Sequence, residues 1–303
     1  MAGNFAFYRY HPSLAAAVIF VILFGLTTLF NIIQICTRRT WYFIPLAIGG
    51  IFEVVGYIGR IMSSNDPLSR NAFIIQQLLL LVAPALFAAS IYIVLGRIII
   101  LVDGERYSLI RQKFLTAVFV SGDVISFLVQ GAGGAILGSS DGDQDSVTLG
   151  QNLVIVGLFV QLFFFAAFVV VAGIFHWRLE GSRSSSSSPS SAVNISVLPW
   201  KRHLVVLYCT SALILVRSIF RVAEYLQGNA GSLLGHEVFL YLFDAVFMLG
   251  VMIVFNVVHP SQVTEALSER LRGESAGGLV EGAQGDAFEM QRAKGGRDSR
   301  LWV

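Results

Sequence analysis

The chain has 303 residues, of which 55% are hydrophobic and only 13% are charged. Soluble domains carry about 25% charged residues, so this composition and a mean hydropathy of +0.71 exclude an ordinary soluble protein and predict an integral membrane protein. The basic residues behind the formal net charge of +2 are spread over loops and a tail, so nucleic-acid binding is not expected.

Seven runs of apolar residues follow one another along the chain, each long enough for a helix that crosses a bilayer. None shows the alternation of a strand, so residues 1–260 are predicted to form an all-α, polytopic bundle of seven transmembrane helices. The first run is too long for the apolar part of a signal peptide, and we expect it to remain as the first span. The predicted spans are 13–35, 41–62, 74–101, 114–137, 151–176, 203–227 and 236–258.

Two segments differ from the spans in composition. Residues 182–191 are Ser-rich and predict a flexible linker between the fifth and sixth helices. Residues 261–303 mix Gly, Ser, Glu and Arg, which predicts a largely disordered tail. Within that tail, 263–271 has the pattern of a short amphipathic helix.

The basic residues of the loops predict the orientation of the bundle, because cytosolic loops carry an excess of Lys and Arg. The side opposite the N-terminus is the basic one, which puts the N-terminus outside and the C-terminus, with the linker and tail, in the cytosol. Only Arg9 and Arg70 lie on the outer side, whereas the other side carries Arg38, Arg39, Arg106, Arg111, Lys113, Arg178, Arg183, Lys201 and Arg202.

The sixth span carries charges that a lipid-facing helix does not tolerate. Arg217, Arg221 and Glu224 are spaced i, i+4, i+7 and therefore share one helical face. A charge at mid-bilayer costs about 2.5–3.5 kcal/mol on insertion scales, so this face must meet protein, a counter-charge or water. The second and seventh spans repeat the spacing, and the fourth adds two polar residues seven apart. The candidate site residues are Glu53, Tyr57, Arg60, Asp123, Gln130, Arg217, Arg221, Glu224, Tyr241 and Asp244.

Two interpretations of these residues compete. They line a polar cavity at mid-to-outer depth that binds a ligand, or they form buried ion pairs that only fix which helix packs on which. Asp123, Arg217 and Asp244 are the deepest, which favours a functional role. Arg60 and Glu237 lie near the predicted surface and are expected to snorkel towards it.

The cytosolic ends of the spans predict ordinary interfacial contacts. Trp41, Tyr42 and Trp200 are expected to belong to an aromatic belt at the membrane interface. Arg97 lies near the same end of its span and is expected to bind lipid headgroups. The two cysteines lie in or beside apolar segments, which predicts free thiols.

Several stretches of the chain together have the pattern of one known family. They are Tyr8–Ser13 (YRYHPS), Arg39–Pro45 (RTWYFIP), Glu53–Arg60 (EVVGYIGR), Ala83–Tyr92 (APALFAASIY), Gly122–Gln130 (GDVISFLVQ), Leu215–Tyr225 (LVRSIFRVAEY), and His236 and Glu237 with Tyr241 and Asp244. With these stretches the chain resembles the fungal RTA-like proteins, also called lipid-translocating exporters. The resemblance covers most of residues 8–260 and implies a seven-helix membrane protein linked to tolerance of membrane-active compounds and to movement of sphingoid long-chain bases or other lipids.

The leading hypothesis is therefore an exporter or translocator of lipids or amphiphiles, with membrane lipids or sphingoid bases as partners and no cofactor. The alternative is a seven-helix lipid receptor or sensor without transport, although the signature motifs of G-protein-coupled receptors are absent from the sequence. An intramembrane zinc enzyme is disfavoured because no histidine pair has HExxH spacing, and no P-loop is present to use ATP. Without a Lys-Asp-Glu-Leu-type retrieval signal, the expected location is the plasma membrane.

Overall fold

A computed structural model describes residues 14–65, 70–139, 143–185, 200–227, 237–270 and 272, and within these ranges it contains helices and no strand. Seven of the helices are long and apolar enough to cross a membrane. This confirms the predicted all-α, seven-helix, multi-pass bundle, while its orientation stays a prediction. The helices are α1 (Leu14–Arg38), η1 (Trp41–Phe43), α2 (Ile44–Asn65), α3 (Arg70–Leu101), η2 (Glu105–Tyr107), α4 (Gln112–Ser139), α5 (Gln144–Ser185), α6 (Trp200–Gln227), α7 (Glu237–Leu240), η4 (Tyr241–Val246) and α8 (Phe247–Val257).

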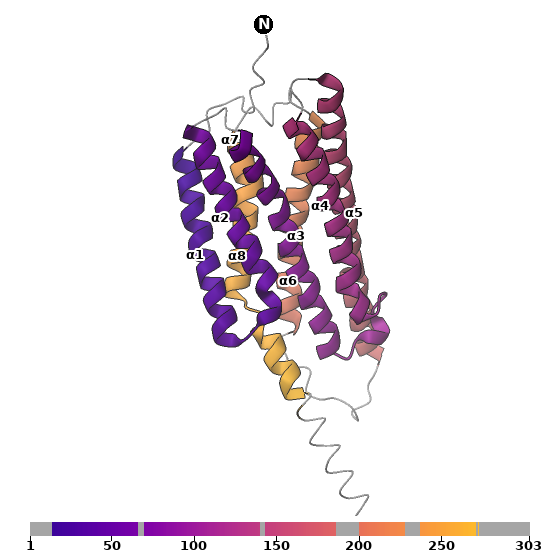
Figure 1. Cartoon of the computed structure of the whole chain (residues 1–303). Helices are drawn as coiled ribbons and strands as arrows, with labels where there is room; N and C mark the ends of the chain where they lie inside the picture. The colour runs from indigo at the N-terminus through magenta and orange to yellow at the C-terminus, as the bar shows by residue number, and fades with distance from the viewer. Residues whose placement is uncertain are drawn as a thin grey trace, which may run out of the picture.

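The long helices stand side by side with their axes roughly parallel to one another (Figure 1). Consecutive helices from α1 to α6 contact each other, α8 contacts both α6 and α1, and α3 also contacts α6. The helix α3 is the central one. In an apolar stretch of 18 residues, 67% of the residues of α3 are buried, against 22% for α1. Large apolar side chains on the outer faces, such as Leu26 and Phe163, are exposed as lipid contact requires.

The helix α5 is longer than the sequence predicts, because it continues past 176 and through the first four residues of the predicted linker 182–191. Leu179 on this extension is buried in the core, as is Phe175 one turn before it, which explains why the extension stays packed. Asp143 caps the other end of α5. Hydrogen bonds from the amide and hydroxyl of Ser146 hold the pKa of Asp143 below its usual range. The rest of the linker lies outside the described residues.

Glycines bring neighbouring helices into close contact at two places in the bundle. A Cβ atom on Gly49 would lie 2.6 Å from the ring of Phe87, so α2 and α3 approach closely there. A Cβ atom on Gly133 would lie 2.7 Å from the carbonyl oxygen of Gly150, so α4 and α5 are close at backbone level. These contacts follow the rule that small residues let helices approach in membranes.

Amide side chains join α1 to α8, the first and last long helices of the bundle. Asn31 Nδ2 donates to Asn256 Oδ1 at 3.2 Å, and Gln34 Nε2 donates to the carbonyl of Asn256 at 2.9 Å. Asn256 Nδ2 in turn donates to the carbonyl of Thr27 at 3.0 Å. These neutral contacts hold α1 in place despite its wide lipid-facing surface.

A short helix at residues 261–270 follows α8 and lies at the end of the bundle away from the N-terminus (Figure 1). Arg38 Nη1 donates to Ser261 Oγ at 2.7 Å, Thr264 Oγ1 donates to Tyr42 Oη at 2.8 Å, and Tyr42 Oη donates to the carbonyl of Pro260 at 3.0 Å. We call the residues Arg38, Tyr42, Arg97, Ser261, Thr264 and Arg270 the C-terminal clasp. The prediction of a disordered tail from 273 onwards lies outside the described residues.

Two predictions for this end of the bundle are wrong. Arg97 is predicted to bind lipid headgroups, but it contacts protein instead. Its guanidinium carbon lies 3.5 Å from the centroid of the Tyr42 ring, and its Nη1 donates to Thr264 Oγ1 at 3.5 Å. Trp200 is only 2% exposed, because it packs at the α5–α6 junction with its ring centroid 6.4 Å from that of His176. Trp41, in contrast, is exposed as an interfacial residue should be.

Candidate functional site

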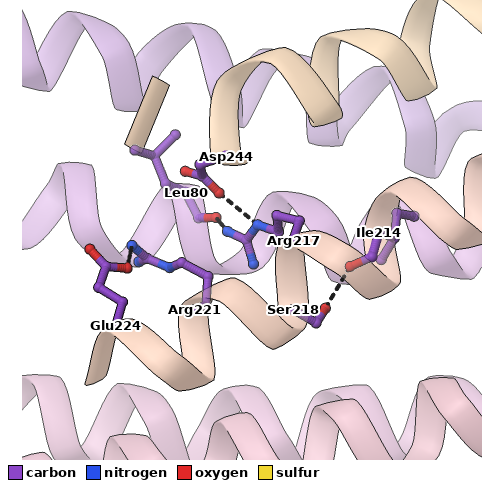
Figure 2. Close-up of polar contacts among 7 residues, drawn as sticks. All are labelled: Leu80, Ile214, Arg217, Ser218, Arg221, Glu224 and Asp244. Carbon is purple, nitrogen blue, oxygen red and sulfur yellow. Dashed lines mark hydrogen bonds and ion pairs between the residues drawn. The ribbon is translucent and has the colours of Figure 1, made fainter. Parts of the chain in front are cut away.

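The helix α6 carries its three charged residues on a buried face, as their spacing predicts. Arg217, Arg221 and Glu224 are between 0% and 5% exposed, whereas Val216 and Ile219 on the other side of the helix are exposed. Arg217 Nε donates to Asp244 Oδ1 at 2.6 Å, and Arg221 Nη1 donates to Glu224 Oε2 at 2.8 Å (Figure 2). One arginine therefore joins α6 to η4, and the other pairs within its own helix.

A second bond from Arg217 depends on a proline in the central helix. Pro84 lies inside α3 and has no amide hydrogen, so the carbonyl of Leu80, four residues earlier, has no intrahelical donor. Arg217 Nη2 donates to this carbonyl at 2.6 Å, and Figure 2 shows the guanidinium between it and Asp244. In a membrane such a freed carbonyl needs a partner. The arginine thus satisfies a backbone group of α3 and an acid of η4 together.

The acid that pairs with Arg217 lies in a π-helical turn. Tyr241–Val246 forms η4, a wide turn between α7 and α8, and both Tyr241 and Asp244 are buried in it. Such turns are rare and are frequent at functional sites. The i, i+4, i+7 spacing of Glu237, Tyr241 and Asp244 assumes a regular α-helix, so the sequence pattern does not reveal this turn.

Arg60 does not snorkel to the surface, which corrects the prediction for this residue. Its side chain is fully buried, and Arg60 Nε donates to the hydroxyl of Tyr241 at 3.0 Å. Tyr241 is held in place by η4, so this contact fixes the end of α2 against the π-helical turn. The side chain of Glu237, for which the same behaviour is predicted, is not among those described.

Glu53 differs from the other acids of these helices. It is 1% exposed, and in the described part of the chain neither of its carboxylate oxygens has a hydrogen-bond partner. Asp244, Arg217 and Arg221 act on it electrostatically, so it lies beside the pairs of α6 and η4 without joining them. Tyr57, one turn further along α2, is fully buried and its hydroxyl also lacks a partner.

Glycines allow the central helix to approach Glu53. Gly49 and Gly56 flank it by about one turn on either side, and a Cβ atom on Gly56 would lie 2.8 Å from Leu80 Cδ2. Since Leu80 also provides the carbonyl that binds Arg217, this close approach brings α2, α3 and α6 together around the acid. We call the following residues the charge cluster: Glu53, Tyr57, Arg60, Arg217, Arg221, Glu224, Tyr241 and Asp244.

Aromatic rings from α1 cover one side of the charge cluster, and the sequence analysis does not identify them. The rings of Phe20 and Tyr241 stack with centroids 5.2 Å apart, and Tyr57 stacks on Phe20 and on Phe24 at 5.6 Å each. Phenylalanines in an apolar run are indistinguishable from lipid-facing residues until the helices are placed. The cluster therefore combines buried charges with an apolar aromatic wall.

Two predicted site residues lie in a separate group. Asp123 accepts a hydrogen bond from the hydroxyl of Tyr92 at 3.0 Å, and Gln130 Nε2 donates to Ser126 Oγ at 2.6 Å and to Gln161 Oε1 at 3.2 Å. These contacts join α4 to α3 and α5, whereas the charge cluster joins α2, α6 and η4. Gln161 is a single amide within a long apolar run, and this is the signal that points to it in the sequence.

The charges of the cluster are not evenly matched around Glu53. Asp244 has Arg217 as its partner and Glu224 has Arg221, so each of these acids is already paired within hydrogen-bond distance. Arg60 lies seven residues from Glu53, about 10 Å along the helix axis, and bonds to Tyr241. Glu53 is thus the one acid of the charge cluster that no basic group of the described residues contacts directly, and a bound cation would compensate its charge. Elsewhere in the described chain, no three His, Cys, Asp or Glu side chains are placed to hold a metal.

A family model described as RTA1 like protein matches residues 46–266. The chain belongs to the RTA1-like family. This confirms the resemblance seen in the sequence, and the matched residues contain the whole charge cluster and half of the C-terminal clasp. No solved structure matches the chain.

Relatives from Saccharomyces cerevisiae align with most of this RTA1-like chain. Protoporphyrin uptake protein 1 (strain ATCC 204508 / S288c) is 36% identical over 290 residues, covering 84% of this chain and 92% of the relative. Protein RTM1 is 34% identical, with coverage of 82% and 90%. Sphingoid long-chain base transporter RSB1 (strain Lalvin EC1118 / Prise de mousse) is 27% identical over 275 residues, with coverage of 82% and 72%.

Proposed function

We propose that this protein translocates cationic amphiphiles across the membrane, with sphingoid long-chain bases as the leading substrates. The observation that carries the proposal is the buried, unpaired carboxylate of Glu53 within a cluster whose other acids are paired. A buried carboxylate without a partner is costly, so a site that keeps one is suited to a ligand that supplies the missing positive charge. The name of the relative RSB1 supports this class of substrate.

The polar atoms without partners match the headgroup of such a substrate. A primary ammonium group has three hydrogens to donate. The two oxygens of Glu53 and the hydroxyl of Tyr57 are three acceptors on one side of α2, each without a partner in the described residues. In this proposal the ammonium group binds between them and the tail remains in lipid. The aromatic wall of Phe20 and Phe24 offers apolar contact to the first carbons of the tail.

The test is transport of a labelled sphingoid base in vesicles that contain the purified protein. We expect Glu53→Gln to weaken binding at least about tenfold, because hydrogen bonds to charged groups contribute about 1.5–3 kcal/mol. Glu180→Gln, at an acid on the exposed end of α5, is the matched control and should transport normally. N-acetylation of the substrate removes its charge and should abolish transport by the unchanged protein.

Two results would contradict this assignment. Transport by Glu53→Gln at the normal rate would show that Glu53 does not bind the headgroup. Equal transport of the free and the acetylated base would show that no cation is recognised. If Glu53 served only to hold helices together, Glu53→Gln would change the unfolding temperature and leave the affinity for the base unchanged.

The plasma membrane, with the N-terminus outside, is the location and orientation that we propose. Cys36 lies near the end of α1 and is a free, exposed thiol, which makes it a probe of sidedness. In intact cells, a thiol reagent that does not cross membranes should leave Cys36 unlabelled and should label it after the cells are opened. Cys209→Ser removes the other thiol, and labelling of Cys36 in intact cells would contradict the orientation.

A further inference from the structure

Asp123 is a buried acid that takes no part in the charge cluster. It lies in the middle of α4 with 4% of its surface exposed. Its Oδ2 accepts the hydrogen bond from Tyr92, and its Oδ1 has no partner in the described chain. The ring of Tyr92 packs against Phe119 and Phe168, with centroids 5.5 and 4.5 Å apart, so the surroundings are apolar.

No positive charge compensates Asp123. The helices packed against α4 are α3 and α5. On α3, the ionisable group that acts on Asp123 is Tyr92, while Arg97 is engaged with Tyr42 and Thr264 towards the other end of that helix. On α5, His176 and Glu180 pair with each other, again near the end of the bundle. Asp123 therefore has no basic partner among the described residues.

This environment separates Asp123 from the paired acids. Asp244 and Glu224 each have an arginine within 2.8 Å, which offsets the cost of burying their charge. For Asp123 the same cost has no such offset, and the neutral, protonated acid is much easier to bury. We propose that Asp123 is a proton-binding site, separate from the headgroup site, and that it takes up and releases one proton in each transport cycle.

The proton would bind at Oδ1, the oxygen that lacks a partner, while the hydroxyl of Tyr92 keeps its own proton and its bond to Oδ2. A polar route to this oxygen runs along the same face of α4. Ser126 and Gln130 follow Asp123 by three and seven residues, which spans about 10 Å of the helix. They bond to the carbonyl of Gly157 and to Gln161 on α5. This strip leads from Asp123 towards the end of the bundle that is predicted to face outside.

The proton site is tested first without any substrate. Infrared difference spectra between acidic and alkaline pH, recorded on the protein in lipid, should contain the carbonyl band of a protonated carboxylic acid. Every carboxyl group that titrates in this range contributes to the band, so we expect Asp123→Asn to remove one component of it and Glu180→Gln, at an exposed acid, to leave that component. Tyr92→Phe should shift it, since one hydrogen bond to the carboxyl group is lost. An unchanged band in Asp123→Asn would overturn the proposal, and Tyr92→Phe provides an independent test because it keeps the acid even if Asp123→Asn does not fold.

The coupling to transport rests on the proposed function and needs the vesicle assay. With labelled sphingoid base, a pH gradient should accelerate transport by the unchanged protein, and Asp123→Asn should lose this acceleration while it still exchanges the base without a gradient. An identical gradient response in Asp123→Asn would refute coupling through Asp123. A complete lack of transport by the unchanged protein would refute the proposed function instead, and the infrared result would stand by itself.

Discussion

The charge cluster and the C-terminal clasp both use arginines to join helices that are distant in the sequence, but they treat their polar atoms differently. In the clasp, the hydrogen bonds of the arginines go to neutral oxygens: Arg38 binds Ser261, and Arg270 Nη1 donates to the carbonyls of Ile100 and Leu101 at 3.2 and 2.9 Å. The one ion pair that the described residues form there, between Arg270 and the exposed Asp103 at 3.9 Å, is long and open to solvent. None of the side chains in the clasp contains a buried atom without a partner. In the cluster, Arg217 and Asp244 each keep one such atom and Glu53 keeps two.

The difference separates a structural network from one that has capacity left for a ligand. Fully satisfied polar networks make a fold rigid, whereas partly satisfied ones are costly where water is excluded. The clasp closes the last turns of α1 and α3 against a helix that follows the bundle, and this is a sufficient role for it. The cluster contains buried atoms without partners among the described residues, and these atoms are the reason to propose a binding role for it.

Breaking the buried ion pair should have the largest effect on stability. Arg217→Met leaves Asp244 and the carbonyl of Leu80 without their donor, so we expect a loss of about 3–5 kcal/mol in the free energy of unfolding. Unfolding in mild detergent measures this. The double variant Arg217→Met with Asp244→Leu removes both charges and should recover most of the loss. If Arg217→Met alone were as stable as the unchanged protein, the ion pair would contribute no more to stability than an exposed surface pair.

The close approach of α2 and α3 beside Glu53 is the next test. Gly49→Ala puts a methyl group 2.6 Å from the Phe87 ring, and we expect a loss of about 1–3 kcal/mol from overpacking. Gly25→Ala is the matched control, because no atom lies within 4 Å of a Cβ there. It should be neutral or stabilising by about 0.5–1 kcal/mol, as for glycine in a helix interior. Equal stabilities of the two variants would show that the contact at Gly49 adapts freely.

The clasp should affect stability and leave transport intact. Thr264→Val removes the hydrogen bond to Tyr42, for which we expect a loss of about 0.5–1.5 kcal/mol. Hydrogen exchange of the amides in 261–270 should rise, while transport in vesicles should stay normal. If transport fell as far as it does in Glu53→Gln, the clasp would be part of the transport machinery and the comparison would fail.

Replacing the proline of α3 should change stability least. In Pro84→Ala the new amide can donate to the carbonyl of Leu80, so one hydrogen bond replaces that of Arg217 and the net change should stay below about 1 kcal/mol. Transport should nevertheless fall, because Arg217 loses one of its two anchors. Pro45→Ala is the control, since Pro45 lies in the first turn of α2, where its missing amide has no intrahelical acceptor. Normal transport by Pro84→Ala would show that the anchor at Leu80 is dispensable.

The sequence predicts the helices and the buried face of α6 correctly, because both follow from local patterns. Apolar runs set the spans, and the spacing of Arg217, Arg221 and Glu224 identifies one face of one helix. It does not identify partners, since these depend on which helices become neighbours. Asp123 and Asp244 look alike in the sequence, because each is an aspartate within an apolar span. In the structure, however, α4 packs against α3 and α5, so Asp123 lies away from the arginines of α6.

Residues near the ends of the spans are the ones for which sequence reasoning fails. An aromatic or basic residue at the end of a span is ordinarily interfacial. Arg97 and Trp200 depart from this rule because the helix 261–270 and the C-terminal part of α5, at His176, provide protein contacts there. The acceptor of Arg217 at Leu80 is a backbone group, so the one trace of it in the sequence is Pro84, four residues later.

The π-helical turn makes this part of the chain sensitive to the loss of a single residue. A turn of this kind accommodates one residue more than the α-helix around it, and each residue of an α-helix turns by about 100°. Deleting Leu242, which is exposed, would let the turn relax to α and would rotate Tyr241 away from Arg60 while α8 keeps its face towards α1 and α6. Relatives one residue shorter between positions 241 and 246 should therefore lack the tyrosine–arginine contact, and this single gap would mark which members of the family share the site.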